Sequence, residues 1–246
     1  MGETTVSRLD SPEDQDAPYA ARLRLPELMA VACVHDREYL DRSMFLSVHQ
    51  ECEIKFAQIV LYLEETRNAL DRRDGLGAAQ RIEMLPAFMQ VLITQFDLLG
   101  RIPADTFEAI RADMGSASGF QSAQWREIEF ICGQRRPGLA YTPGFSEQER
   151  KGLQARLEET SLDAAFEQFQ EATEPDDAGE RIADGLRAFD ETVRRWRTRH
   201  ADLAEQFLGS RPGTAGSSGV AYLRTVAKQR LFPSLWPAPA LEGEAV

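Results

Sequence analysis

The chain has 246 residues, 43% of them hydrophobic, and a formal net charge of −12 at pH 7, so it can bury a substantial core but is poorly suited to binding nucleic acid. Its three cysteines form no C-x-x-C pair, which argues against a disulfide framework. We find neither an apolar signal segment nor an uninterrupted apolar run that would span a bilayer, and we expect a cytoplasmic protein with no membrane partner.

Helical periodicity runs through most of the chain. Residues 1–17 are acidic and poor in apolar side chains, which predicts a disordered tail. Long helices are expected at about 40–73 and 78–99, with Pro86 as a candidate kink, and shorter helical stretches at about 146–172. Alternating runs of β-branched residues are missing. The sequence therefore predicts an all-α helical bundle, with one domain over residues 18–236 and a C-terminal tail at 237–246.

The last long helical pattern presents a single apolar stripe, on which one histidine is expected to face the core. Its members recur at alternating spacings of four and three residues: Ile182, Leu186, Phe189, Val193, Trp196, His200, Leu203 and Phe207. His200 is either a core histidine hydrogen-bonded to a backbone carbonyl or an axial ligand of haem iron. A zinc site is not indicated, because no neighbouring Cys, His or Glu completes one.

Three further features could carry chemistry. His49 lies on an apolar helical face one turn after Phe45, and a second core-facing histidine strengthens the case for a metal or substrate site. Arg111 precedes a loop of small residues and is either a solvated arginine at a helix end or a clamp for a carboxylate. The segment from Gly213 to Gly219 is either a flexible linker or a mobile lid over a ligand.

Five segments occur in a fixed order along the chain: "MFLSVHQECEIKFAQI", "IRADMGSASGFQSAQWREIE", "WRTRH", "GTAGSSGVAYLR" and "RLFPSLW". Together they resemble the motifs of the tryptophan 2,3-dioxygenase family, and the resemblance extends from about Tyr19 to Trp236. It implies an all-α fold of that family's type, haem b as the cofactor, and a homotetramer. It also implies O2 and L-tryptophan, or a substituted tryptophan, as substrates.

The resemblance implies a role for each matching residue. His200 matches the axial ligand of the haem iron, and His49 matches the distal catalytic histidine that hydrogen-bonds the indole N–H. The other matches bind substrate: Phe45 matches an aromatic that packs on the ring, and Arg111 an arginine that pairs with the carboxylate. Ser118 and Gly119 match a loop on the distal side, and Thr214 a hydroxyl at the polar end of the amino acid. Tyr19 and Leu23 match an N-terminal segment that caps a neighbouring subunit's pocket.

Departures from the family pattern surround the expected substrate more than the haem. Arg22 stands where the family has a second N-terminal tyrosine, and Ala215 replaces a glycine of the expected lid. The leading hypothesis is a haem-dependent oxygenase that inserts oxygen from O2 into the indole ring of L-tryptophan or a substituted tryptophan. The alternatives are a haem-dependent monooxygenase of a modified tryptophan, giving an oxindole or hydroxylated product, and a non-catalytic helical protein that binds haem or another ligand.

Overall fold

The structure, a computed structural model, describes residues 18–32, 39–211, 213 and 218–236. Within these ranges the chain forms helices and no strand, which confirms the prediction of an all-α protein. The chain divides into two compact units, residues 1–50 and 51–246. The predicted tails at 1–17 and 237–246 lie outside the described residues, and the single domain over 18–236 stays a prediction.

The N-terminal unit contains α1 (Tyr19–Arg22), α2 (Leu25–Val31) and the beginning of α3 (Leu40–Asp71). Arg24, with a left-handed φ of 50°, separates α1 from α2. The side-chain amide of Gln50 on α3 donates a hydrogen bond to the carbonyl of Val31 at 3.0 Å, which ties the end of α2 to α3. The apolar side chains of α1 and α2 are largely exposed, so this unit has little core of its own.

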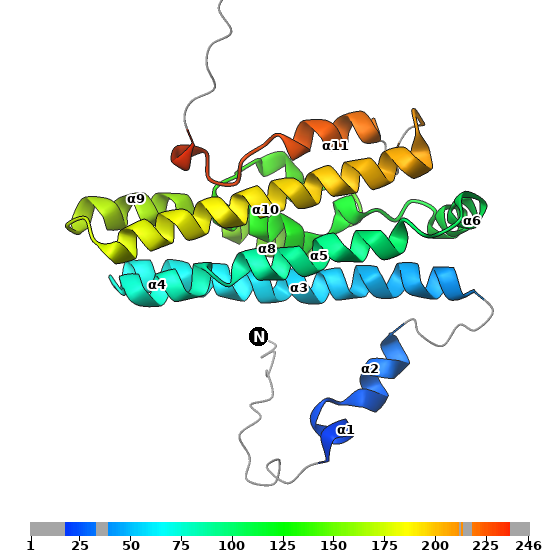
Figure 1. Ribbon diagram of the computed structural model, residues 1–246, viewed down its shortest axis with the longest axis horizontal. Helices are drawn as coiled ribbons and strands as arrows, with labels where there is room; N and C mark the ends of the chain where they lie inside the picture. The colour runs from blue at the N-terminus through cyan, green and yellow to red at the C-terminus, as the bar shows by residue number, and fades with distance from the viewer. Residues whose placement is uncertain (1–17, 33–38, 212, 214–217, 237–246) are drawn as a thin grey trace, which may run out of the picture. The chain divides into compact units, whose positions relative to one another are not determined.

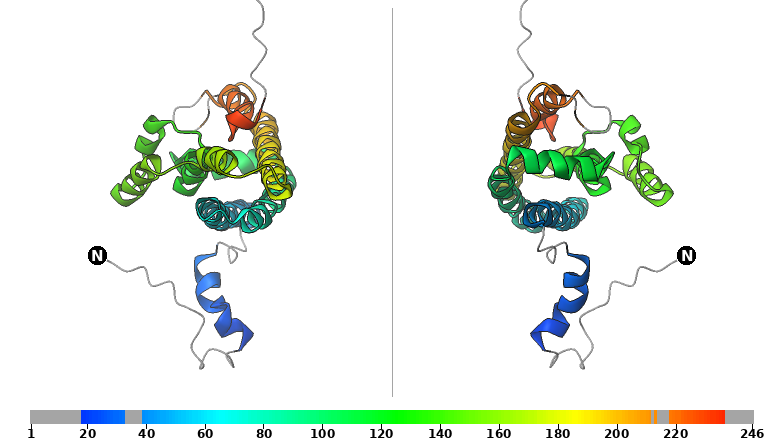
Figure 2. Two further views of the ribbon diagram at one scale, coloured as in Figure 1. Left: turned by 90° about the vertical axis from the view of Figure 1, so that its left-hand side faces the viewer. Right: turned by 90° about the vertical axis from the view of Figure 1, so that its right-hand side faces the viewer.

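The second unit is the helical bundle. After the remainder of α3 it contains α4 (Gly75–Ile82), α5 (Leu85–Leu99), α6 (Ala104–Met114), η2 (Gly119–Gln121), α7 (Ala123–Cys132), η3 (Pro137–Tyr141), α8 (Glu147–Glu158), α9 (Leu162–Ala172), α10 (Asp177–Leu208), α11 (Val220–Ala227) and η5 (Pro233–Leu235). The long helix α10 packs along α4 and α5 and also against α11 (Figure 1). Views along the bundle show α5 and α10 nearly end-on, so their axes run in roughly the same direction (Figure 2).

The helix expected at 78–99 is in fact two helices, α4 and α5. The chain turns at Glu83 and Met84, and Pro86 lies in the first turn of α5, where its missing N–H breaks no helical hydrogen bond. Pro86 therefore starts a helix and does not kink one. Among the described helices, the stretch Gly75–Leu99 alone is long and apolar enough to cross a membrane. The buried core helices of a bundle can have the same length and composition.

The apolar stripe of α10 forms the centre of the core over its first half. The side chains of Ile182, Leu186, Phe189 and Val193 are fully buried, as the sequence predicts. The stripe then opens to solvent, because Trp196, His200 and Leu203 are only half-buried, before Phe207 closes it again. The expectation that His200 faces the core is therefore wrong in part, because this position is only half-buried although its ring stacks on Phe96 of α5.

Candidate active site

His200 lies on α10 beside a cluster of aromatic rings. Its imidazole stacks almost parallel to Phe96 of α5, with ring centroids 5.6 Å apart and an angle of 10°, and Trp196 lies 6.0 Å away on the preceding turn. Trp196 in turn packs against Trp125 of α7 at 4.7 Å. A long helix and two aromatic neighbours thus fix the direction of a half-buried imidazole, as an axial metal ligand requires.

His49 and Phe45 lie on the part of α3 that belongs to the N-terminal unit. The Nδ1 atom of His49 is 2.7 Å from the carbonyl oxygen of Phe45, and the two rings are 4.3 Å apart. A carbonyl only accepts, so Nδ1 carries the hydrogen and Nε2 of the neutral imidazole is an acceptor. Desolvation by the surrounding protein lowers the pKa of His49, and the weaker effect of the carbonyl hydrogen bond raises it. The expectation of a core-facing His49 is wrong, because the residue is exposed in this chain, although neighbouring atoms such as the Phe45 ring at 4.3 Å still desolvate the imidazole.

Arg111 is a half-buried residue on α6, a helix that packs against the C-terminal end of α10. Phe107 and Phe207 stack at 4.1 Å with an angle of 12°. The guanidinium of Arg211 donates to both carboxylate oxygens of Glu108, at 2.9 and 2.5 Å. The structure therefore brings the helix of Arg111 to α10 two turns beyond His200.

Ser118 and Gly119 stand in a hydrogen-bonded turn before α7. The Ser118 hydroxyl accepts from the Phe120 N–H at 3.3 Å, while the Ser118 N–H donates to the side chain of Gln121 at 3.1 Å, which completes a capping box. A Cβ built on Gly119 would meet no atom within 4 Å, so this position is open. Phe120 packs edge-to-face on Tyr222 of α11 at 5.5 Å, and this contact joins the loop to the helix after the expected lid.

The other predicted substrate residues are less defined by the structure. Tyr19 and Leu23 are 75% and 48% exposed on the N-terminal unit, and a cap on a neighbouring subunit stays a prediction. Thr214 lies outside the described residues, as does most of the expected lid between Gly213 and Gly219.

The sequence pattern of the tryptophan 2,3-dioxygenase family matches residues 13–180 and 176–240 of this chain. The tryptophan 2,3-dioxygenase of Nocardioides sp. is 31% identical over 245 residues, which cover 89% of this chain and 92% of that protein. The enzyme of the same name from Herpetosiphon aurantiacus is 30% identical over 256 residues, covering 90% and 97%. This chain belongs to the tryptophan 2,3-dioxygenase family. It is therefore a member of a family of oxidoreductases.

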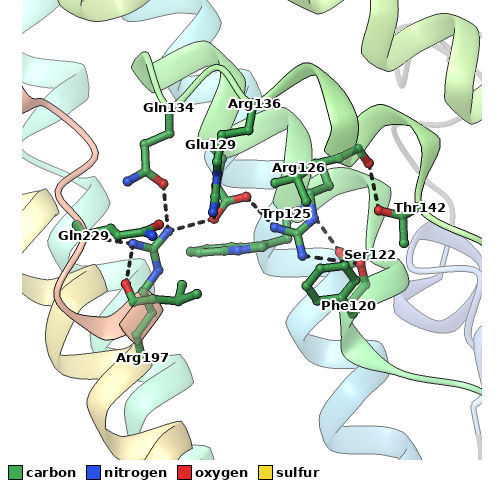
Figure 3. Close-up of polar contacts among 12 residues, drawn as sticks. Phe120, Ser122, Trp125, Arg126, Glu129, Gln134, Arg136, Thr142, Arg197 and Gln229 are labelled. Carbon is green, nitrogen blue, oxygen red and sulfur yellow. Dashed lines mark hydrogen bonds and ion pairs between the residues drawn. The ribbon is translucent and has the colours of Figure 1, made fainter. Parts of the chain in front are cut away.

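In this member of the tryptophan 2,3-dioxygenase family, two of the recognised motifs meet through buried charges that the sequence analysis did not single out. Glu129 of α7, fully buried, accepts from Arg126 at 2.5 Å and from Arg197 of α10 at 2.8 Å (Figure 3). Arg126 and Glu129 stand in the segment that begins "SGFQS", and Arg197 stands within "WRTRH". The sequence feature that could have predicted these ion pairs is the presence of charged residues among the apolar positions of "QWREIEFIC". A charged side chain on such a helix face must be paired when it is buried.

The donor set suits a haem better than a metal held by several side chains. Over the described part of the chain, no group of three or more His, Cys, Asp or Glu side chains could hold a metal ion. A haem needs a single protein ligand, and His200 offers one on a half-open aromatic face. The buried Nε1 of Trp196, one turn before His200, also has no hydrogen-bond partner. A buried donor without a partner is a group that a bound molecule or water can satisfy.

Proposed function

We propose that this chain binds haem b through His200 and uses O2 to oxygenate the indole ring of L-tryptophan or a substituted tryptophan. The observation that carries the proposal is the position of His200, a half-buried and aromatic-flanked imidazole on the helix of the "WRTRH" motif in a member of this family. When bound, the haem supplies the iron at which O2 is activated.

The residues of the chain bind and orient the substrate. Arg111 pairs with the carboxylate of the amino acid, because a guanidinium recognises a carboxylate through two parallel hydrogen bonds. Phe45 packs on the ring, while Ser118 and Gly119 line the distal side. Fixing the carboxylate and the ring together places the indole C2–C3 bond for reaction. Thr214 completes the polar end of the pocket in this proposal.

His49 holds the indole ring by accepting a hydrogen bond. Its Nδ1–H is directed at the Phe45 carbonyl, so the Nε2 lone pair accepts from the indole N–H. The lowered pKa of His49 keeps the imidazole neutral and able to accept. An indole N–H is a very weak acid, and its full removal by a neutral imidazole with an ordinary pKa of ~6.5 is steeply uphill. His49 therefore positions the ring and does not act as an obligatory base.

The assembly we propose is a homotetramer in which Tyr19 and Leu23 cap a neighbouring subunit's pocket. It is supported by exposed apolar side chains along two helices of the bundle. On α3, Ile54 and Leu61 are 52% and 61% exposed, and on α5, Val91 and Leu98 are 45% and 47% exposed. Members of each pair are seven residues apart and share a helix face. In this proposal each pair belongs to a surface that another copy of the chain covers.

The test is haem reconstitution followed by product mass. The purified protein, loaded with haem, should show the Soret band of a histidine-ligated haem, and His200→Ala should lose it while His49→Ala keeps it. Incubation with tryptophan and O2 should give a product heavier by two oxygen atoms. A gain of one oxygen would point to the monooxygenase, and no product would leave a haem-binding protein. An unchanged spectrum in His200→Ala would remove His200 from the site.

A further inference from the structure

Glu129 is a buried carboxylate at the centre of the contacts that join two segments of the proposed site to the chain after α11. We propose that Glu129 is a positioning residue, which holds α10 near His200, the Ser118–Ser122 loop and the chain after α11 in one arrangement. This inference rests on the proposed function for its catalytic meaning, but the arrangement itself involves only contacts within residues 51–246.

On one side Glu129 holds Arg197, which lies three residues before His200 on α10. The guanidinium of Arg197 donates to Glu129 Oε1 at 2.8 Å and to the backbone carbonyls of Gln229 and Val226 at 3.1 and 3.4 Å (Figure 3). It also donates to the side chain of Gln134 at 3.3 Å. Arg197 therefore connects the helix of the proposed haem ligand to α7 and to the segment that follows α11.

On the other side Glu129 holds Arg126, one turn earlier on α7. Arg126 donates to the backbone carbonyl of Phe120 at 3.4 Å, and its Cζ lies 4.5 Å from the centroid of the Phe120 ring. Phe120 is the middle residue of the Ser118–Ser122 loop and packs on Tyr222 of α11. Glu129 thus reaches the distal loop through one arginine and the haem-ligand helix through the other.

The charges make this arrangement directional. A guanidinium presents its donors in a fixed planar fork, so its hydrogen bonds set the direction as well as the distance of the groups they join. Desolvation lowers the pKa of Arg197, and the Glu129 carboxylate counteracts this effect. Arg136 is a third cation near Glu129, at 3.5 Å, while the Nε atoms of Arg126 and Arg197 are buried without partners. Well-packed apolar side chains often replace a buried ion pair without loss of stability, but they lack the directed hydrogen bonds that join these three segments.

Loss of the negative charge should therefore loosen two separate segments. Glu129→Gln keeps the shape of the side chain but leaves two buried guanidiniums without their shared anion. The loop amides of Gln121 and Ser122, and the amides of Lys228 and Gln229, are all hydrogen-bonded to backbone carbonyls in the intact protein. Both sets should be protected from exchange in the intact protein and open more often in the variant.

Hydrogen exchange of the full-length purified protein, read by mass spectrometry of peptides, tests the arrangement without haem or substrate. In Glu129→Gln, exchange at residues 119–122 and 226–230 should rise at least about tenfold. The control is Glu127→Gln on the same helix, whose carboxylate also accepts from an arginine, Arg156 at 3.1 Å. It should leave both peptides unchanged. Because neither measurement needs turnover, the exchange result can be interpreted even if the proposed function is wrong.

A milder variant separates the two sides. Arg197→Lys keeps the charge but cannot reach Glu129 and two carbonyls together, so exchange should rise at 226–230 and not at 119–122. With haem and tryptophan bound, Glu129→Gln should raise KM at least about tenfold at an unchanged Soret band, because the loop is loosened and the ligand is kept. Glu129→Gln exchange that matches wild type, or that rises evenly over the whole bundle, would overturn the proposal. If Glu129→Gln does not fold, Arg197→Lys takes its place: exchange equal to that of the wild type, or an even rise over the whole bundle, would then overturn the proposal.

Discussion

Arg111 is the residue on which substrate selection rests in the proposed site. Arg111 lies on α6 one turn after Glu108, whose two carboxylate oxygens accept from Arg211. Arg111→Met should lower kcat/KM for tryptophan at least about tenfold, chiefly by raising KM, since a charge-assisted pair contributes ~1.5–3 kcal/mol. Steady-state kinetics measure this. Tryptamine, which lacks the carboxylate, is the control, and equal turnover of tryptamine and tryptophan by the wild type would contradict the role.

His49 is the residue that separates orientation from proton chemistry. His49→Ala should retain the haem spectrum and lose rate, with the general acid–base range of ~10²–10⁴ as the upper limit, because the substrate is still bound. Ring N-methylated tryptophan should be turned over faster by this variant than by wild type, since the methyl group then has room. Product formation in single turnovers measures both. A variant that binds haem and tryptophan but forms no product would show that His49 is an obligatory base.

At the scale of elements, the contact of α4 with α10 depends on the absence of a side chain at Gly185. A Cβ there would lie 2.6 Å from Cγ2 of Ile82, a fully buried residue. Gly185→Ala should therefore destabilise the protein by ~1–3 kcal/mol, although alanine favours helix by about 1 kcal/mol. Chemical denaturation measures the difference. Gly152→Ala on α8 is the matched control, because nothing lies within 4 Å of its Cβ, and it should stabilise by ~0.5–1 kcal/mol.

The C-terminal segment is tied to α10 by a carboxylate whose effect depends on pH. Arg194 and Arg230 lower the pKa of Glu191 from its ordinary value of 4.5 to about 2. A depressed pKa in the folded state adds stability above the ordinary pKa, and this contribution is lost as the pH falls toward 2. Glu191→Gln should lower the melting temperature near pH 7 by at most about 2–4 °C, since the side chain is part-exposed and screened.

The pH dependence of that melting difference is the test. Between wild type and Glu191→Gln it should shrink as the pH is lowered from about 5 to about 3, as the linked protonation requires. Asp184→Asn is the control, because Asp184 is 81% exposed and pairs with Arg187 of the same helix. A difference that grows on acidification would contradict the role of Glu191.

At the scale of the whole molecule, the exposed stripes of α3 and α5 should be interfaces between copies of the chain. Leu61→Glu places a charge on the most exposed of these apolar side chains and should dissociate the proposed tetramer without loss of helix. Sedimentation measures the mass and circular dichroism the fold. Gln168→Glu, at an exposed position of α9, adds the same charge away from the stripes and should leave the tetramer intact.

The sequence alone determined the all-α class, the long stripe of α10 and the motifs that identify the family, because periodic apolar residues and short motifs are local properties of the chain. It misplaced the boundary at Pro86, since an apolar run does not reveal where a proline starts a new helix. The tertiary structure decided how far each residue is buried. His200 is only half-buried although its ring stacks on Phe96, and His49 is exposed in spite of its apolar neighbours. The buried set of Arg126, Glu129 and Arg197 is formed by α7 and α10, which are distant in sequence, so only packing could bring these charges together.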